Sequence, residues 1–190
     1  MVENPERQFT IQEKIYNFDL IFKTTYGLFA YKEIDDGTRL LINSIKIEDG
    51  TACLDLGCGY GVIGIVMAKL NPNGRVYCVD RDFVAVEYAK KNCELNDIRN
   101  CEVFLSDGFS NIRDLRFDII ASNPPTHISH DMLKLIFSDA KKYLKPHGKL
   151  YVVTASKLKR FIKTQFEEIF HNYTHIQNDN LYTVSLVEKL

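Results

Sequence analysis

The amino-acid sequence predicts an α/β fold built around a mainly parallel sheet, with helices on both faces of the sheet. From Thr51 onward, short β-branched or apolar runs alternate with longer amphipathic stretches, which is the pattern of strand-helix-strand units. Turn-forming segments, Asn71–Gly74 and Pro146–Gly148, follow two of the amphipathic stretches and mark where the helices end. The chain has 190 residues and is 45% hydrophobic, which fits one domain with a buried core.

The first part of the chain, residues 1–50, is expected to be a lead-in that packs on the same domain, because it is too short to form its own core. Phe18–Lys23 and Leu28–Tyr31 flank a Thr-Tyr-Gly turn, and this arrangement predicts a small hairpin. A helix that is capped at Asp36 and runs through Ile42 is expected to follow.

Residues 51–190 are expected to form the core of the fold. The predicted parallel strands are Ala52–Leu56, Arg75–Asp80, Cys101–Ser106, Phe117–Ser122 and Lys149–Thr154. The predicted helices are Val62–Leu70, Asp82–Leu95, Ser129–Leu144 and Ser156–Phe170. The tail differs, because His175–Gln177 and Leu181–Val187 flank an Asn-Asp-Asn turn. This pattern predicts a C-terminal antiparallel hairpin that completes the sheet.

Composition excludes several classes of protein. The formal net charge is −1, so the chain lacks the strongly basic surface of a protein that coats nucleic acid, and any RNA binding must use local patches. The N-terminus does not read as a signal peptide and no apolar run is long enough to span a membrane, which predicts a cytoplasmic protein. The five cysteines show no Cys-x-x-Cys pair, so we expect reduced thiols and no metal site.

The first predicted strand leads directly into Gly57-Cys58-Gly59-Tyr60-Gly61 and then into a helix. Open α/β folds bind ligands at this edge of the sheet, and glycines permit positive φ and close approach of a ligand. Gly57, Gly59 and Gly61 are therefore candidate cofactor-binding residues. The stretch from Gly59 to Gly64 also fits the dinucleotide pattern G-x-G-x-x-G, so the glycines alone do not choose between two cofactors.

Three aspartates near the ends of strands add to the cofactor prediction. Asp80 ends the second strand, where a carboxylate can accept hydrogen bonds from ribose hydroxyls, and Asp107 follows the third, where it can accept from an adenine amino group. Each could instead cap the next helix. Asp55, at the end of the glycine-loop strand, would attract an ammonium or sulfonium and repel a pyrophosphate. That charge favours S-adenosylmethionine over NAD.

The fourth predicted strand runs into Asn123-Pro124-Pro125, a proline-restricted turn at the same edge of the sheet. Alone, it would be an ordinary strand-ending turn. Together with Leu54–Gly61, it resembles the class I methyltransferases that carry an (Asn/Asp)-Pro-Pro-aromatic motif and methylate adenine N6, guanine N2 or a glutamine amide. The resemblance implies a Rossmann-like seven-stranded fold and S-adenosylmethionine as cofactor. In this arrangement, the Asn123 oxygen and the Pro124 carbonyl would accept both N–H bonds of a planar nitrogen, with Asn123 beside the cofactor.

The lead-in is also similar to a known family. Gly27–Ala30, followed by Asp36-Gly37-Thr38, resembles the same region of the small-subunit ribosomal RNA guanine-N2 methyltransferases and their single-domain relatives. That resemblance implies that Phe29 and Thr38 lie near the methionine end of the cofactor. Ordinary core packing would equally explain Phe29.

The acceptor loop departs from the family at one position. By resemblance, Pro125, Thr126 and His127 would contact the target base, yet Thr126 stands where an aromatic residue usually stacks on it. The imidazole of His127 could supply a planar ring one residue later.

These observations predict an S-adenosylmethionine-dependent N-methyltransferase whose acceptor is the exocyclic N2 of guanine in RNA, with ribosomal RNA as the expected partner. The alternatives are a methyltransferase that acts on a glutamine amide or a small metabolite, and a pseudo-methyltransferase without turnover. An NAD-dependent oxidoreductase would use the Gly59–Gly64 pattern, but it would leave Asn123–Pro125 without a role.

Overall fold

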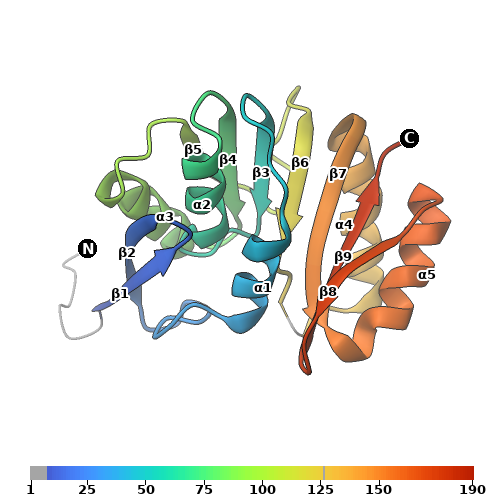
Figure 1. Ribbon diagram of the computed structural model, residues 1–190, viewed down its shortest axis with the longest axis horizontal. Helices are drawn as coiled ribbons and strands as arrows, with labels where there is room; N and C mark the ends of the chain where they lie inside the picture. The colour runs from blue at the N-terminus through green and yellow to red at the C-terminus, as the bar shows by residue number, and fades with distance from the viewer. Residues whose placement is uncertain (1–7, 126) are drawn as a thin grey trace.

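A twisted sheet of seven strands organises the chain in the computed structural model, which describes residues 8–125 and 127–190 (Figure 1). The strand order is β5-β4-β3-β6-β7-β9-β8. The parallel strands are β3 (Ala52–Leu56), β4 (Arg75–Asp80), β5 (Cys101–Leu105), β6 (Phe117–Ser122) and β7 (Leu144–Ala155). The antiparallel strands are β8 (Thr174–Asn178) and β9 (Tyr182–Glu188). The predicted mainly parallel sheet with a C-terminal hairpin is therefore confirmed.

Helices cover both faces of this sheet, as predicted. On one face lie α1 (Asp36–Ser44), α2 (Val62–Leu70) and α3 (Phe83–Leu95), and on the other lie α4 (His130–Tyr143) and α5 (Lys159–Phe170) (Figure 1). A short 3-10 turn, η2 (Ser156–Leu158), precedes α5. Cys53 of β3 packs into one hydrophobic cluster and Leu54 into the other, and both are fully buried. Among the described residues, no helix has the length and apolar character needed to cross a membrane.

The lead-in corrects the sequence prediction in two places. Its hairpin pairs β1 (Gln8–Ile15) with β2 (Phe18–Thr25), and Leu28–Tyr31 forms turns instead of the predicted second strand. β1 was missed because polar residues separate its two buried isoleucines, so it carries little apolar signal. The N-cap of α1 is Asp35 and not Asp36, since the Asp35 side chain accepts a hydrogen bond from Thr38 N at 3.0 Å.

The approach to β7 also differs from the prediction. The strand begins at Leu144 and continues through Pro146–Gly148, which was expected to be a turn. The pairing of β7 with β6 shifts register in this segment, between Phe117 and Ile119. His147 takes a positive φ of 62°, so a local irregularity in the strand takes the place of a separate turn.

Two asparagines of α3 attach the lead-in to the core. Asn92 Oδ1 accepts from Lys23 N at 2.7 Å, and its Nδ2 donates to Lys23 O at 2.9 Å and to Tyr60 O at 2.8 Å. One turn later, Asn96 makes the same pair of bonds to Ile21 N and O, at 3.0 and 2.8 Å. These side chains bond backbone groups of β2 as a neighbouring strand would, and Asn92 links β2 to the glycine loop.

We predict that Asn92→Ala lowers the free energy of unfolding by about 2–4 kcal/mol, because it leaves buried backbone groups of Lys23 and Tyr60 without partners. Equilibrium denaturation in urea measures this loss. Glu94→Ala is the matched control, since Glu94 lies on the same helix but is exposed; its expected change is below about 0.5 kcal/mol. Equal losses for the two variants would contradict the role assigned to Asn92.

Candidate active site

Two loops meet at the carboxyl edge of the sheet because β3 and β6 are neighbouring parallel strands. The pairing ends with a side-chain bond, in which Ser122 Oγ donates to Leu56 O at 2.8 Å. Gly57 and Asn123 are the next residues along the two strands, so the glycine loop and the Asn-Pro-Pro turn start side by side. The two motifs that the sequence placed at one edge thus border one site.

The glycine loop has the backbone that its sequence predicts. Gly57 and Gly59 have φ values of 77° and 54°, and a Cβ on either would meet no atom within 4 Å. Backbone conformation rather than crowding therefore requires glycine at both positions. The open space beside them is also where a ligand can approach the backbone. Gly61 is the N-cap of α2, with φ 94°.

The third and last glycine of the dinucleotide pattern, Gly64, has a packing role. A Cβ on Gly64 would lie 2.0 Å from Cys78 Sγ, so glycine is needed where α2 crosses β4. Gly64 N also donates to Asp55 Oδ2 at 2.8 Å. Contact between helix and sheet thus accounts for the Gly59–Gly64 spacing without any dinucleotide.

Asp80 stands at the end of β4 with its carboxylate beside the glycine loop. Its Oδ2 accepts from Gly59 N at 2.9 Å and its Oδ1 accepts from Asp82 N at 2.9 Å. A carboxylate has about four acceptor positions, so capacity remains for the two hydroxyls of a ribose. Asp82 is the residue that caps α3, which leaves Asp80 available for a ligand.

Asp107 is exposed just beyond β5, at the same edge of the sheet. The described segment 107–116 contains turns and no helix, so Asp107 does not act as a helix cap. A ligand-binding role for this side chain remains a proposal.

The environment of the Asp55 side chain differs from the one that its position at the end of a strand predicted. The side chain is fully buried under α2, Oδ2 bonds Gly64 N, and Oδ1 has no hydrogen-bond partner among the described residues. Burial raises the pKa of this carboxyl to about 8, because the charged form loses its hydration. The group is thus largely neutral at pH 7 and lies behind the loop. Burial disfavours the charged form on which the expected attraction to the cofactor depends, and a contact between Asp55 and the cofactor stays a prediction.

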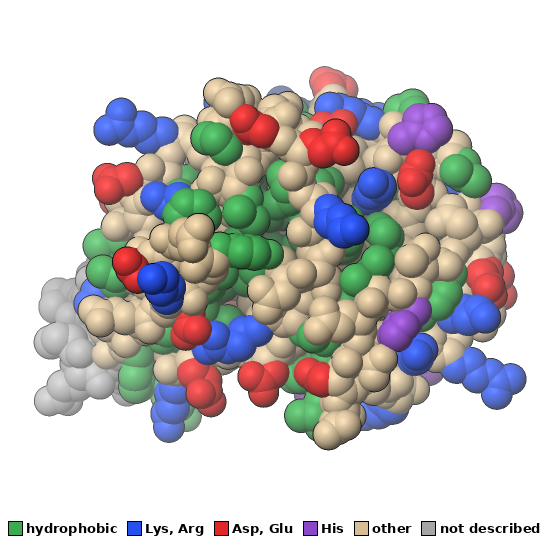
Figure 2. All heavy atoms as spheres, in the orientation of Figure 1, with side chains coloured by type: hydrophobic (Ala, Val, Ile, Leu, Met, Phe, Trp, Pro, Cys, Tyr) green, Lys and Arg blue, Asp and Glu red, His purple; other side chains and the backbone are tan. Residues whose placement is uncertain are grey.

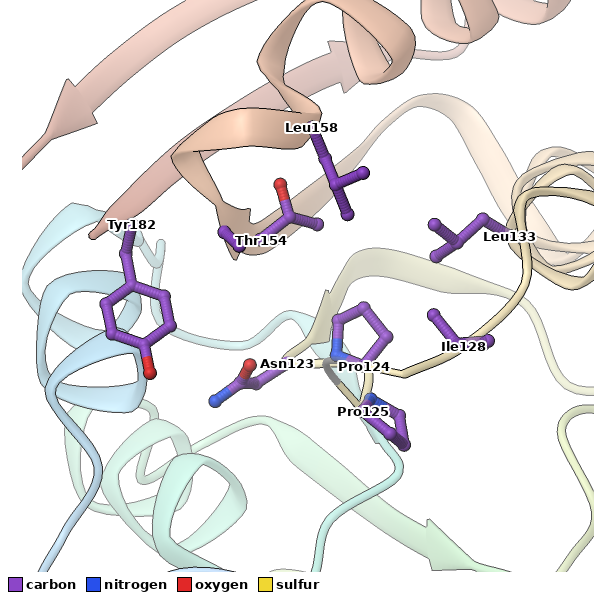
Figure 3. A pocket seen from close by; sticks show the side chains of 9 residues that line it. Asn123, Pro124, Pro125, Ile128, Leu133, Thr154, Leu158 and Tyr182 are labelled. Carbon is purple, nitrogen blue, oxygen red and sulfur yellow. The ribbon is translucent and has the colours of Figure 1, made fainter.

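Asn123 lies half-buried at the centre of the site, and its amide has a defined orientation. Its Nδ2 donates to Asp35 Oδ2 at 3.0 Å and to Thr38 Oγ1 at 2.9 Å. No described residue donates to Oδ1. Tyr182 OH donates to the other oxygen of Asp35 at 3.0 Å, and Figure 3 shows the Tyr182 ring beside Asn123. The predicted site residue Thr38 is thus in contact with Asn123.

A pocket opens directly beside Asn123 (Figure 3). Its walls are mostly apolar and come from the Asn-Pro-Pro turn, the segment after it, α4, the end of β7, η2 and the start of β9. The lining residues are Asn123, Pro124, Pro125, Ile128, Leu133, Thr154, Ala155, Leu158 and Tyr182. Apolar walls next to a polar amide suit a flat ring that carries a polar edge.

The remaining predicted residues are more peripheral. Phe29 is 58% exposed in the loop after β2, and Tyr60 OH donates to the adjacent Ala30 O at 3.2 Å, which ties this loop to the glycine loop. His127 is exposed; the imidazole that stacks belongs to His130, whose centroid is 4.0 Å from that of Phe161. Thr126 lies outside the described residues.

Sequence reasoning missed Asp35 and Tyr182. The only signal for Asp35 was a pair of adjacent acids before a helix, in which either could be the cap. The sequence pattern predicted Tyr182 only as part of a strand in the terminal hairpin. Its contact with Asp35 joins residues that are 147 positions apart, which no local pattern reports.

The face of the molecule in Figure 2 has no single sign of charge. In Figure 2, acidic and basic side chains are interspersed over the visible face, in keeping with the net charge of −1. Within the described part of the chain, no group of three or more His, Cys, Asp or Glu side chains is placed to hold a metal ion.

The fold and the site together define a class I methyltransferase: a sheet of this order with a glycine loop, an acid after the next strand and an Asn-Pro-Pro turn at one edge. The chain belongs to the Methyltransferase small domain family, whose model matches residues 19–185. It is accordingly an S-adenosylmethionine-dependent methyltransferase. The family resemblance predicted from the motifs is confirmed.

Three known proteins illustrate the relationship. The chain is 32% identical over 182 residues to an uncharacterised protein of Bacillus subtilis, with 93% of this chain and 90% of that protein covered. It is 35% identical over 171 residues to the ribosomal RNA large subunit methyltransferase G of Klebsiella pneumoniae, covering 86% of this chain and 45% of the enzyme. The structure of a 16S rRNA guanine-N2 methyltransferase of T. thermophilus, in complex with AdoMet and guanosine, superposes with a TM-score of 0.89 at 25% identity.

That alignment covers 98% of this chain and 52% of the T. thermophilus protein. The chain therefore spans about half the length of the two ribosomal RNA methyltransferases and nearly all of the B. subtilis protein.

We predict that Asp55 makes stability depend on pH. Its folded-state pKa is raised to about 8 from 3.8, so the folded state binds a proton that the unfolded state has lost. This contribution is fully present below about pH 4 and is lost as pH rises through 8, at about 1.4 kcal/mol per pKa unit. Asp55→Asn keeps an oxygen for Gly64 N and cannot ionise. Its melting temperature should therefore fall less than that of the wild type between pH 6 and 9, and parallel curves would contradict the prediction.

Proposed function

We propose that this protein transfers a methyl group to the exocyclic N2 of guanine in RNA, with ribosomal RNA as the substrate class. The observation that carries the proposal is the orientation of Asn123, whose amide nitrogen is bonded to Asp35 and Thr38 so that its oxygen remains for a ligand. Two relatives support the choice of acceptor: one is named for ribosomal RNA, and the other is complexed with guanosine.

S-adenosylmethionine, when bound, would supply a methyl group on a positively charged sulfur: a nitrogen lone pair can attack the methyl carbon in line, and the sulfur leaves with the S–C bonding electrons as neutral S-adenosylhomocysteine. The residues that would hold it line the carboxyl edge of the sheet. Gly57 and Gly59 leave open space beside the backbone, and Asp80 retains acceptor positions for ribose hydroxyls. Asp107 would accept from the adenine amino group, and Phe29 would cover the methionine end. The open cradle and the free acceptors fit this cofactor.

The target nitrogen is a poor nucleophile, because its lone pair is conjugated with the purine ring. Asn123 Oδ1 and the Pro124 carbonyl can each accept one of its N–H bonds, which directs the lone pair toward the methyl group. As the new N–C bond forms, the nitrogen becomes acidic and its proton can pass to solvent. A strongly shifted general base is therefore unnecessary, which agrees with the lack of a histidine among the described lining residues.

The flat faces of the base would lie against the apolar walls of the pocket, with Pro125 at its rim and Thr126 and His127 following. Phosphate contacts must be local, since the chain is nearly neutral. Several lysines already have partners, because Lys142 pairs with Asp139 and Lys145 with Asp118, at 2.8 and 2.7 Å. In contrast, three exposed basic residues surround the pocket residue Leu158 at the start of α5: Lys157, Lys159 and Arg160. We infer that RNA phosphates bind there.

A second acceptor class uses the same chemistry. Two hydrogen-bond acceptors on a rigid turn would hold the NH2 group of a glutamine side chain or of a small metabolite equally well. The interspersed surface charges and the residue after the prolines favour this alternative over an extended RNA interface.

The proposal is tested by incubating the protein with methyl-labelled S-adenosylmethionine and total ribosomal RNA, followed by mass analysis of the nucleosides. Labelled N2-methylguanosine is the expected product. Label in a different nucleoside would correct the acceptor atom. Cofactor binding by calorimetry without any label in RNA would reject the RNA proposal, and a protein extract as substrate would then test the amide alternative.

We predict that Asn123→Ala lowers the single-turnover rate of methyl transfer by about 100-fold or more, because the acceptor nitrogen loses one of the two groups that orient it. Rapid-quench measurements at saturating RNA and cofactor give this rate. Asn111→Ala, in the turn after β5, is the control for removal of an asparagine amide and should leave the rate unchanged. A loss below about threefold for Asn123→Ala would place the orienting group elsewhere.

We also predict that Asp80→Asn weakens S-adenosylmethionine binding by about 10- to 100-fold, the effect of a lost hydrogen bond to a charged group. The amide oxygen can still accept from Gly59 N, which preserves the contact with the glycine loop, whereas Asp82 N loses its acceptor. Isothermal titration calorimetry measures the dissociation constant. Asp114→Asn, on the exposed segment before β6, controls for the change in net charge. An unchanged dissociation constant for Asp80→Asn would show that Asp80 does not bind the cofactor.

A further inference from the structure

The Asn123 side chain can present either of two chemically opposite ends to an acceptor. Its amide oxygen accepts hydrogen bonds and its amide nitrogen donates them, and a half-turn about the last side-chain bond exchanges the two. With the nitrogen facing the pocket, two donors would oppose each other and the target N–H bonds would have no partner there. Something in the site must therefore select one orientation.

Asp35 is the group that can make this selection. A carboxylate only accepts, so the Asn123 atom that lies 3.0 Å from Asp35 Oδ2 has to be the NH2 group. Thr38 Oγ1, at 2.9 Å, also contacts that nitrogen, but a hydroxyl can accept or donate and so imposes no direction. We propose that Asp35 is a positioning residue that holds the oxygen of Asn123 toward the acceptor; this inference rests on the proposed role of Asn123.

The position of the Asp35 carboxylate is itself fixed on several sides. Its Oδ2 accepts from Thr38 N at 3.0 Å as the N-cap of α1, and its Oδ1 accepts from Tyr182 OH at 3.0 Å. A Cβ on Gly37 would come within 2.9 Å of both Asp35 Oδ2 and the Tyr182 ring, so glycine permits this close packing. The lead-in and the last strand thus meet at one carboxylate, which contacts two residues of the pocket, Asn123 and Tyr182.

Asp35→Ser separates the positioning role from helix capping. Serine caps a helix about as well as aspartate, but its side chain is too short to keep the contact with Asn123. We expect the single-turnover rate to fall about 10- to 100-fold, with the dissociation constant for S-adenosylmethionine changed less than about threefold. Asp36→Ser, which makes the same replacement at the next, exposed residue, should leave both quantities unchanged. Asp35→Asn keeps one oxygen and should retain an intermediate rate.

A substitution at Asn123 should reverse the effect of Asp35→Ser on the single-turnover rate. In Asn123→Asp, both side-chain oxygens accept, so no orientation needs to be selected, but the new carboxylate is repelled by Asp35. Adding Asp35→Ser to this background should therefore raise the rate, whereas the same substitution lowers it in the wild type. A purely structural role for Asp35 predicts a loss in both backgrounds, and that result would overturn the proposal.

A measurement without substrate separates this inference from the proposed function. In a 15N-labelled sample, the Asn123 side-chain NH2 signals are assigned by their absence in Asn123→Asp. Asp35→Ser should move these signals and speed their exchange with water, while Asp36→Ser leaves them in place. Unaltered signals in Asp35→Ser would refute the positioning role even if RNA is methylated. Altered signals combined with an absence of RNA methylation would refute only the RNA proposal.

Discussion

The parallel pairing of β3 with β6 is the constraint on which the site depends. It reverses the direction in which the sheet grows, because β4 lies on one side of β3 and β6 on the other. Ligands bind at such a reversal in open α/β sheets. The register places the ends of both strands level, and Ser122 Oγ bonds Leu56 O at that point. A shift of two residues would displace the Asn-Pro-Pro turn by about 7 Å along the glycine loop, too far for both to contact one methyl group.

Segments outside the parallel core contact both loops and complete the site. Asn92 bonds the backbone of β2 and of the glycine loop, so it ties the lead-in to the cofactor side of the site. Asp35 at the start of α1 and Tyr182 at the start of β9 meet at Asn123 on the acceptor side. The core therefore positions the backbone of both loops, whereas the lead-in and the terminal strand hold the side chain of Asn123.

The sequence predicted the parts of the structure that local patterns encode. Strands β3, β4 and β6 are buried on both faces and bounded by strong turn signals, so their apolar runs were visible, as were the glycines of the loop after β3. β1 was missed because a run of three polar residues separates its two buried isoleucines, so the apolar alternation of a strand is absent. The state of Asp55 was also missed, since desolvation depends on what packs around the carboxyl. The Asp35–Tyr182 contact lies beyond any pattern read along the chain, because its two residues are distant in sequence.

The two proposed hydrogen-bond acceptors of the site would select the group that is methylated but not the molecule that carries it. In the proposed arrangement, the Asn123 oxygen and the Pro124 carbonyl would require a group with two N–H bonds, because a hydroxyl would leave one acceptor unpaired. They do not distinguish the amino group of guanine from that of adenine or from an amide, because all three present the same pair of donors. Under the proposed function, that distinction must come from contacts with the rest of the acceptor, for which the remaining pocket residues, such as Ile128, Leu133 and Leu158, are available. Under the proposed function, substitutions among those lining residues should therefore change which acceptor is methylated without abolishing methyl transfer.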